Sequence, residues 1–165
     1  RGESGELEVK GPSLMREYLD NPEATARAFT ADGFFKTGDL GYMTGPATFV
    51  YQTRLGDTLR LAGIQVSPVE IESHLCEHPD VAKAQVVAVR VGDRTCAYAF
   101  IIAARDPVDI ESVRAHCVSS LASFKVPIEF RVLAEFPTIQ SANGTKFQRT
   151  KLRQMAATDI SKDSR

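Results

Sequence analysis

The 165-residue sequence lacks the features that would direct a protein into a membrane, onto nucleic acid or into an oxidising compartment. No apolar run approaches the roughly 20 residues that a membrane-spanning helix needs. The net charge of −1 provides no whole-domain attraction to nucleic acid or to anionic lipid. The three cysteines, Cys76, Cys96 and Cys117, are widely spaced and form no C-x-x-C pair. They argue against a disulfide framework and a zinc site, and they favour a reducing, cytoplasmic location.

Familiar catalytic and metal-binding signatures are missing as well. The sequence contains no Gly-x-Ser-x-Gly motif and no G-x-G-x-x-G loop. His74 and His78 are four residues apart beside Cys76, but they do not form H-E-x-x-H and no third ligand is evident. His116 has no partner that the sequence indicates. We therefore expect an ordinary helix surface here and no metal site.

The first third of the chain predicts short strands and little helix. Strands are expected over residues 5–11, 34–42 and 48–53, the second of them broken at Thr37-Gly38-Asp39. Asn21-Pro22 is typical of a helix start, because Asn can cap and Pro suits the first turn. A segment of this size is too small to bury a core alone. The chain also begins Arg1-Gly2-Glu3 without methionine, so we expect a fragment of a longer protein.

The rest of the chain alternates strand and helix signals and predicts a compact α+β domain with antiparallel strands. Ser67-Pro68 followed by Glu70 is typical of a capping box, Gly92-Asp93 of a hairpin, and Asp106-Pro107 of a helix start. The expected strands occupy residues 57–61, 81–91, 95–104 and 128–133. A polar loop over 140–146, a basic helix near 150–157 and a frayed polar tail over 158–165 complete the prediction.

Three separated motifs carry groups suited to binding a nucleotide. They are Thr37-Gly38-Asp39, the segment Thr53-Arg54-Leu55-Gly56-Asp57, and Asn143-Gly144-Thr145-Lys146-Phe147-Gln148-Arg149. An ionised carboxylate offers two acceptor oxygens that match a cis-diol, and a guanidinium holds a ribose edge or a phosphate in a fixed fork. A mobile ammonium can stabilise negative charge that develops on a phosphate.

In this order the motifs resemble those of the AMP-forming acyl-CoA synthetases, within the wider adenylate-forming, or AMP-binding, family. The resemblance covers nearly the whole chain. It implies that Asp39 and Arg54 bind the nucleotide and that Lys146 is the catalytic adenylation lysine. Thr145 stands where the family usually has glycine, and the loop before Lys146 is longer than usual.

The resemblance also implies a moving lid. Gly56 and Asp57 match the hinge, although the family usually has Asp or Lys where Gly56 stands. Residues 62–72 resemble the family's Gly-x-x-(V)-x-P-x-E-I-E signature, which implies that Gly63 and Ile64 line the tunnel for the CoA thiol arm. The implied divisions are the end of a large domain over residues 1–55, the lid over 56–157 and the tail over 158–165.

Each motif has a structural interpretation beside the functional one. Asp39 can end a strand in a turn, and Arg54 with Asp57 can form a surface pair. Helix capping accounts for Glu70, and we expect Glu70 and Glu72 to be structural. The basic run from 146 to 153 contains no acid and can be a solvated helix start; with Phe147 as its one aromatic residue, it gives little support for nucleic-acid binding.

The implied parent enzyme joins a carboxylic acid to ATP with Mg²⁺, releases pyrophosphate, and transfers the acyl group from acyl-AMP to CoA; fatty acid metabolism is the expected setting. ATP, Mg²⁺ and CoA act as substrates, and no permanently bound cofactor is expected. The phosphate-binding loop and the acid pocket are absent from the sequence, so the chain alone is expected to be inactive. An adenylating enzyme that serves a carrier protein and a non-catalytic interaction module with the lid fold stay open as alternatives.

Overall fold

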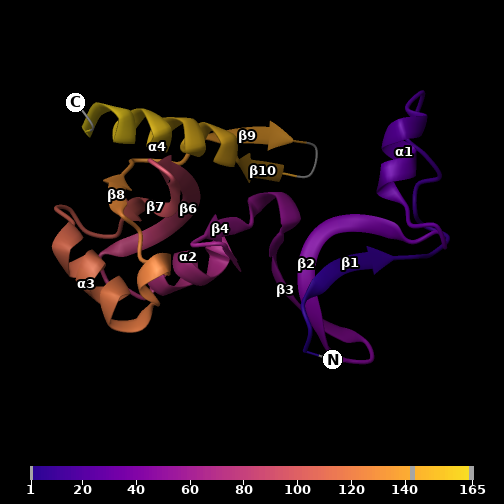
Figure 1. Ribbon diagram of the computed structural model, residues 1–165, viewed down its shortest axis with the longest axis horizontal. Coiled ribbons are helices and arrows are strands. Elements are labelled where there is room, and N and C mark those ends of the chain that lie inside the picture. Colours follow the sequence, from indigo (N-terminus) through magenta and orange to yellow (C-terminus); the bar gives the residue numbers. More distant parts are fainter. Residues whose placement is uncertain (1, 142–143, 164–165) are drawn as a thin grey trace. The chain divides into compact units, whose positions relative to one another are not determined.

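The computed structural model describes residues 2–141 and 144–163, and the chain divides into two compact units, Arg1–Gly56 and Asp57–Arg165 (Figure 1). The first unit is mainly β-sheet. The second packs helices against both faces of a mixed sheet, which confirms the predicted α+β class. Across the described residues, no helix is both long enough and apolar enough to cross a membrane.

The first unit is built on a three-stranded antiparallel sheet of β1 (Gly5–Val9), β2 (Phe35–Gly45) and β3 (Thr48–Arg54), in that order. The predicted break in the second strand is wrong, because β2 runs on through residues 37–39. Gly38 takes the irregularity instead. Its φ of 73° lies in the left-handed region, which glycine adopts without a steric penalty.

A short helix, α1 (Pro22–Ala28), joins the first two strands of this unit. Its start is the predicted one: the Asn21 side chain accepts a hydrogen bond from the amide of Ala24 at 3.0 Å, and Pro22 opens the first turn. Among the described residues of the unit no hydrophobic side chain is fully buried, and Phe49 and Tyr51 are about half exposed, at 48% and 51%.

The second unit opens with a hairpin of β4 (Leu59–Leu61) and β5 (Ile64–Val66), which leads into α2 (Pro68–Cys76). A central sheet follows in the order β6-β7-β8. Two of its strands form the predicted antiparallel hairpin, β6 (Val81–Val91) and β7 (Arg94–Ala103). After α3 (Ile110–Ser120), the chain returns as β8 (Glu129–Val132) parallel to β7, a pairing that the sequence had not indicated.

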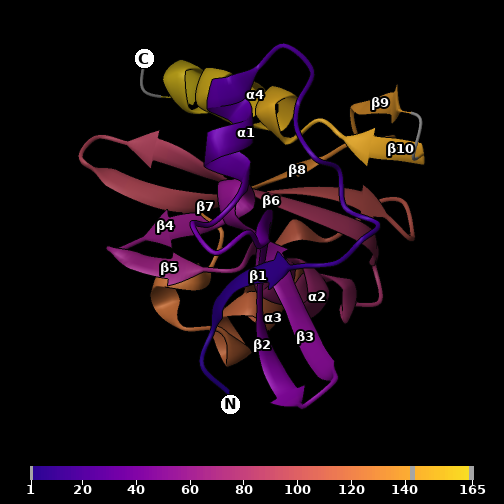
Figure 2. The same ribbon diagram turned by 90° about the vertical axis from the view of Figure 1, so that its right-hand side faces the viewer.

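Side chains alternate between two hydrophobic cores because successive residues of a strand face opposite sides of a sheet. Ala97, Ala99 and Ile101 of β7 pack on the face covered by α2 and α3. Tyr98 and Phe100 point to the other face, which is covered by α4 (Arg149–Asp163) (Figure 2). Helices on both faces therefore bury the central part of the sheet.

One predicted helix start is wrong, and a second is confirmed in position but lacks the predicted side-chain cap bond. The third helix begins at Ile110, where Asp109 accepts hydrogen bonds from the amides of Glu111 and Ser112, and not at Asp106-Pro107. At the start of α2, Ser67 is the N-cap residue but makes no side-chain cap bond within the described residues. The Glu70 carboxylate binds Lys125, and the Ser67 side-chain half of the predicted capping box is missing.

The C-terminal region is more ordered than predicted. Residues 140–146, expected as a polar loop, contribute to a hairpin of β9 (Thr138–Ser141) and β10 (Gly144–Phe147), while residues 142–143 lie outside the described residues. The last helix continues past residue 157 to Asp163, where a frayed tail was expected; residues 164–165 are not described.

A partly buried polar contact involves the additional residues of this helix. Asp159 accepts a hydrogen bond from the Tyr98 hydroxyl at 2.9 Å and forms an ion pair with Arg131 at 2.8 Å. Burial raises the pKa of Tyr98 above its usual range, and the hydrogen bond to Asp159 acts in the same direction. The segment that reads as a polar tail in sequence is therefore bound to the sheet.

Candidate nucleotide and acyl-transfer site

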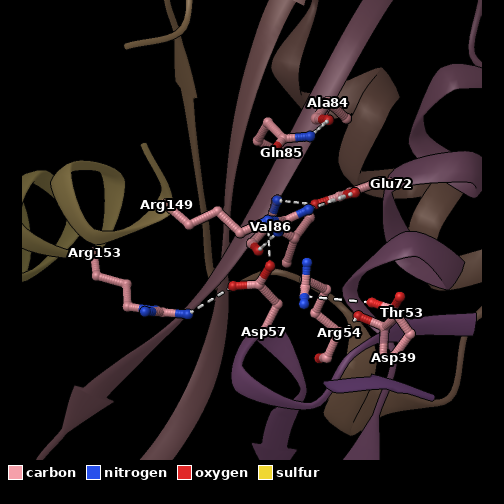
Figure 3. Close-up of polar contacts among 10 residues, drawn as sticks. All are labelled: Asp39, Thr53, Arg54, Asp57, Glu72, Ala84, Gln85, Val86, Arg149 and Arg153. Atoms are coloured by element: carbon pink, nitrogen blue, oxygen red, sulfur yellow. Dashed lines mark hydrogen bonds and ion pairs between the residues drawn. The ribbon is translucent and has the colours of Figure 1, made fainter. Parts of the chain in front are cut away.

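The first predicted motif and the arginine of the second meet across a pair of strands. Asp39 of β2 lies opposite Arg54 of β3, and Arg54 Nε is 3.3 Å from Asp39 Oδ1 (Figure 3). Arg54 also donates to the carbonyl oxygen of Thr37 at 2.8 Å. The side chain of Asp39 is 30% exposed and that of Arg54 is 58% exposed, so both can still reach a ligand.

The part of β2 just before Asp39 is held from several sides. The Thr37 hydroxyl donates to the carbonyl of Leu7 at 2.7 Å and accepts from the Asp39 amide at 3.1 Å. The Gly38 amide donates to the Glu6 carboxylate at 3.0 Å. These bonds fix the backbone that carries the Asp39 carboxylate, which is the preorganisation that a diol-binding group needs.

Lys146, the predicted catalytic residue, belongs to the second unit. It lies on β10 opposite Ile139 of β9, and its side chain is exposed. A strand fixes its backbone more firmly than the predicted loop would. The Asp39–Arg54 pair is a feature of the first unit and Lys146 a feature of the second.

Arg149 lies three residues after Lys146, at the start of α4, and forms a largely buried ion pair with Glu72. The sequence did not indicate this pair. The Arg149 guanidinium binds both oxygens of Glu72, at 2.9 and 3.2 Å, and donates to the carbonyl of Val86 at 3.1 Å (Figure 3). Glu72 in turn accepts from the Val86 amide at 2.8 Å. The basic run contains no acid of its own, but Glu72 of α2 pairs with it, and Glu72 has the structural role expected of it.

The predicted hinge carboxylate joins the same network. Asp57 lies 3.5 Å from Arg149 and 3.3 Å from Arg153, so two arginines of α4 hold it (Figure 3). Gly56, the residue before it, lies in a short 3₁₀ turn (Leu55–Asp57), and a side chain added there would meet no atom within 4 Å. Of the two residues predicted as the hinge, Gly56 thus lies in a turn where an added side chain would have room. Asp57 is held by two arginines of the second unit.

Gly63 and Ala62 form the two-residue turn of the β4–β5 hairpin. Both have positive φ, 49° for Ala62 and 80° for Gly63, as the type I′ turns that suit such hairpins require. Gly63 is thus demanded by the backbone, and a Cβ added there would meet no atom within 4 Å. Because glycine has no side chain, nothing projects from the hairpin tip at this position.

This tip borders a cavity of about 580 Å³ within the second unit. Two arginines and one aromatic ring stand out in its lining, which consists of Arg60, Ala62, Gly63, Asp93, Arg94, Thr95, Cys96, Ser123, Phe124, Val126 and Ile128. Ile64, the second residue predicted for the tunnel, lies on β5, is 51% exposed and is not part of this lining. The cavity can take a ligand with both an apolar and an anionic part.

The chain is similar to a known family and to several known proteins. Residues 70–143 match the family described as "AMP-binding enzyme C-terminal domain". Over 154 residues the chain is 37% identical to the sulfoacetate–CoA ligase of Cupriavidus necator, which covers 92% of this chain and 30% of that enzyme. It is 36% identical over 140 residues to pyochelin synthase PchD of Pseudomonas aeruginosa, covering 82% of this chain and 25% of that protein.

Solved structures show the same relationship. ATP-bound MatB from Rhodopseudomonas palustris superposes with a TM-score of 0.85 at 31% identity, over 94% of this chain and 31% of that one. The o-succinylbenzoate CoA synthetase of Bacillus subtilis, in complex with its acyl-adenylate intermediate, gives a TM-score of 0.80 at 32% identity, over 92% and 31%. The chain therefore belongs to the adenylate-forming, AMP-binding enzyme family. It spans about 30% of the length of the first of these curated relatives.

Proposed function

We propose that this chain is the C-terminal part of an AMP-forming acyl-CoA synthetase of the cytoplasm. In the first step a carboxylate oxygen of the acid attacks the α-phosphate of Mg²⁺-bound ATP, and the bond to pyrophosphate breaks. In the second step the CoA thiol attacks the acyl carbon, loses its proton, and AMP leaves. The gain is chemical, because a carboxylate is a poor electrophile whereas AMP is a competent leaving group.

The observation that carries the proposal is the Asp39–Arg54 pair. Two residues fifteen positions apart, both matching nucleotide contacts of the family, stand opposite each other on adjacent strands. Arg54 is steadied by the Thr37 carbonyl, and the Asp39 backbone by the Thr37 hydroxyl. A carboxylate and a guanidinium held side by side can bind the two hydroxyls of a ribose together with a nearby oxygen.

The second unit would act as the lid in both steps. Lys146 would bridge the acid carboxylate and the α-phosphate in the first step, where it stabilises charge as the new bond forms. Rotation at Gly56 and Asp57 would then replace Lys146 by the Gly63 hairpin, whose cavity contains two arginines that suit an anionic thiol carrier. The acceptor would be CoA; a carrier protein that presents a similar thiol is the second candidate, because the chain is similar to a pyochelin synthase as well as to CoA ligases.

The chain alone should not form acyl-AMP. The proposal assigns the phosphate-binding loop and the acid pocket to sequence outside residues 1–165, so proximity and charge stabilisation cannot be assembled. We expect no ATP–pyrophosphate exchange above background with any carboxylic acid. Robust exchange by residues 1–165, abolished by Lys146→Ala to exclude a contaminant, would show that this assignment is mistaken.

Gly63→Trp in the longer enzyme should block acyl transfer while sparing adenylation, because an indole at the hairpin tip would fill the neighbouring cavity. The matched control is Gly63→Ala. It carries the same strain of a side chain at a φ of 80°, yet its Cβ meets no atom within 4 Å.

The two half-reactions are measured separately, with acyl-AMP supplied for the second. We expect thioester formation to fall at least about tenfold for the Trp variant relative to the Ala variant, since a misplaced group can cost about a hundredfold. Equal thioester rates in the two variants would exclude the hairpin tip from the thiol path.

A further inference from the structure

The second unit contains a histidine cluster that the ligase chemistry does not use. His74 near the end of α2 stacks on His116 of α3, with ring centroids 4.2 Å apart and an angle of 5° between the planes. The two helices pack against each other on one face of the sheet (Figure 2). The sequence indicates no partner for His116, whereas in the structure it contacts His74, which lies 42 residues away.

Hydrogen bonds fix which ring nitrogen of each histidine is available. His74 Nε2 lies 3.2 Å from the carbonyl oxygen of His116, and His116 Nε2 lies 3.0 Å from the carbonyl oxygen of His74. A carbonyl oxygen only accepts, so both Nε2 atoms carry the proton. In the neutral rings Nδ1 therefore presents a lone pair, and backbone carbonyls provide the outer contacts typical of metal-binding histidines.

A carboxylate faces one of these lone pairs. His74 Nδ1 is 3.2 Å from Glu77 Oε2, and the His74 side chain is only 13% exposed. Two electron-pair donors at this distance repel unless a proton, as in an ion pair, or a metal ion lies between them. One ligand atom from each of His74, Glu77 and His116 lies within 4.8 Å of the others. The remaining histidine of the cluster, His78, has its own partners in Ser112 and the Asp80 amide.

We propose that His74, Glu77 and His116 form a binding site for a divalent transition metal of the zinc class, which joins α2 to α3. Two imidazoles and one carboxylate are a ligand set suited to zinc, and a water completes four-coordination. Zinc–ligand distances of about 2.0–2.2 Å place two ligand atoms at most roughly 4.3 Å apart. The cluster must contract by less than about 1 Å, and the parallel rings must tilt toward each other. Glu77, with 66% of its side chain exposed, is free to follow.

The site is tested on residues 1–165 by calorimetric titration with ZnCl₂ at neutral pH, and by thermal unfolding with zinc and with EDTA. We expect one zinc ion per chain and a rise of several degrees in Tm at saturation. Cobalt(II) should bind at the same place and report four-coordination in its visible absorption. Glu77→Gln and His116→Asn should each weaken binding at least about tenfold.

Three controls separate the cluster from other zinc sites and from misfolding. Glu111→Gln removes an exposed carboxylate of α3 outside the cluster and should bind zinc as the parent chain does. Cys76→Ser removes the thiol next to Glu77 and should also leave binding unchanged. Each variant is first shown to fold by circular dichroism without metal. Absence of saturable binding, binding unchanged in Glu77→Gln and His116→Asn, or binding lost only in Cys76→Ser would overturn the proposal.

Discussion

Lys146→Ala in the longer enzyme is expected to slow acyl-adenylate formation by about 10²–10³-fold, which is some 3–4 kcal/mol of transition-state stabilisation. The ammonium is proposed to act on the α-phosphate in the first step only. Thioester formation from supplied acyl-AMP should therefore stay close to the parent rate. The exposed position of Lys146 on β10 means that the substitution should cost little folding stability.

The matched control is Lys151→Ala, which removes an exposed lysine from the same basic segment. It should leave both half-reactions near the parent rates, because Lys151 lies on α4 and outside the motif of Lys146. If Lys146→Ala slowed the two steps equally, the lysine would serve the fold or general binding. The model of a lid with a separate face for each step would then fail.

Arg149→Met should be the most destabilising substitution among the charged residues of the network. It leaves the Glu72 carboxylate, whose side chain is 11% exposed, without its two-pronged partner. Removing one member of a buried ion pair typically costs about 3–5 kcal/mol, because the remaining charge stays buried. The measurement is the free energy of unfolding of residues 1–165 from denaturant titration.

Arg153→Met provides the control for this effect. Arg153 contacts the same Asp57 but its side chain is 39% exposed, so its loss should cost far less. The double variant Glu72→Met with Arg149→Met should be more stable than the sum of the two single changes predicts, because no unpaired charge remains. A single Arg149→Met variant no less stable than Arg153→Met would show that the pair does not hold α4 in place.

Local features of the fold were predictable because their signals lie within a few residues. Asn21-Pro22 starts α1 as expected, and Gly92-Asp93 turns the β6–β7 hairpin. The same reasoning failed at Asp106-Pro107, and at Ser67 it placed the helix start correctly but not the side-chain cap bond. Asp109 caps α3, and Lys125 binds the Glu70 carboxylate. Local sequence propensity indicates several possible helix starts and turns, and tertiary packing determines which of them form.

Long-range partners could not be predicted from one sequence. Glu72 and Arg149 are 77 residues apart, and Tyr98 and Asp159 are 61 apart. Many acids and bases of the chain could pair equally well by charge alone. The first pair lies at the start of α4, and the second ties the last part of α4 to the sheet. The residues of the candidate site were easier to predict from the sequence, because they fall in short motifs whose order along the chain matches a family.

The central claim is that the longer enzyme activates an acid as acyl-AMP and then transfers it to a thiol. The most direct test supplies the full-length protein with ATP, Mg²⁺ and a panel of carboxylic acids, with and without CoA. The account predicts acid-dependent ATP–pyrophosphate exchange without CoA, and AMP release with acyl-CoA formation when CoA is added. Loss of exchange in Lys146→Ala would assign the first step to this chain. Formation of ADP and phosphate, or AMP release that depends on neither acid nor thiol, would contradict the account.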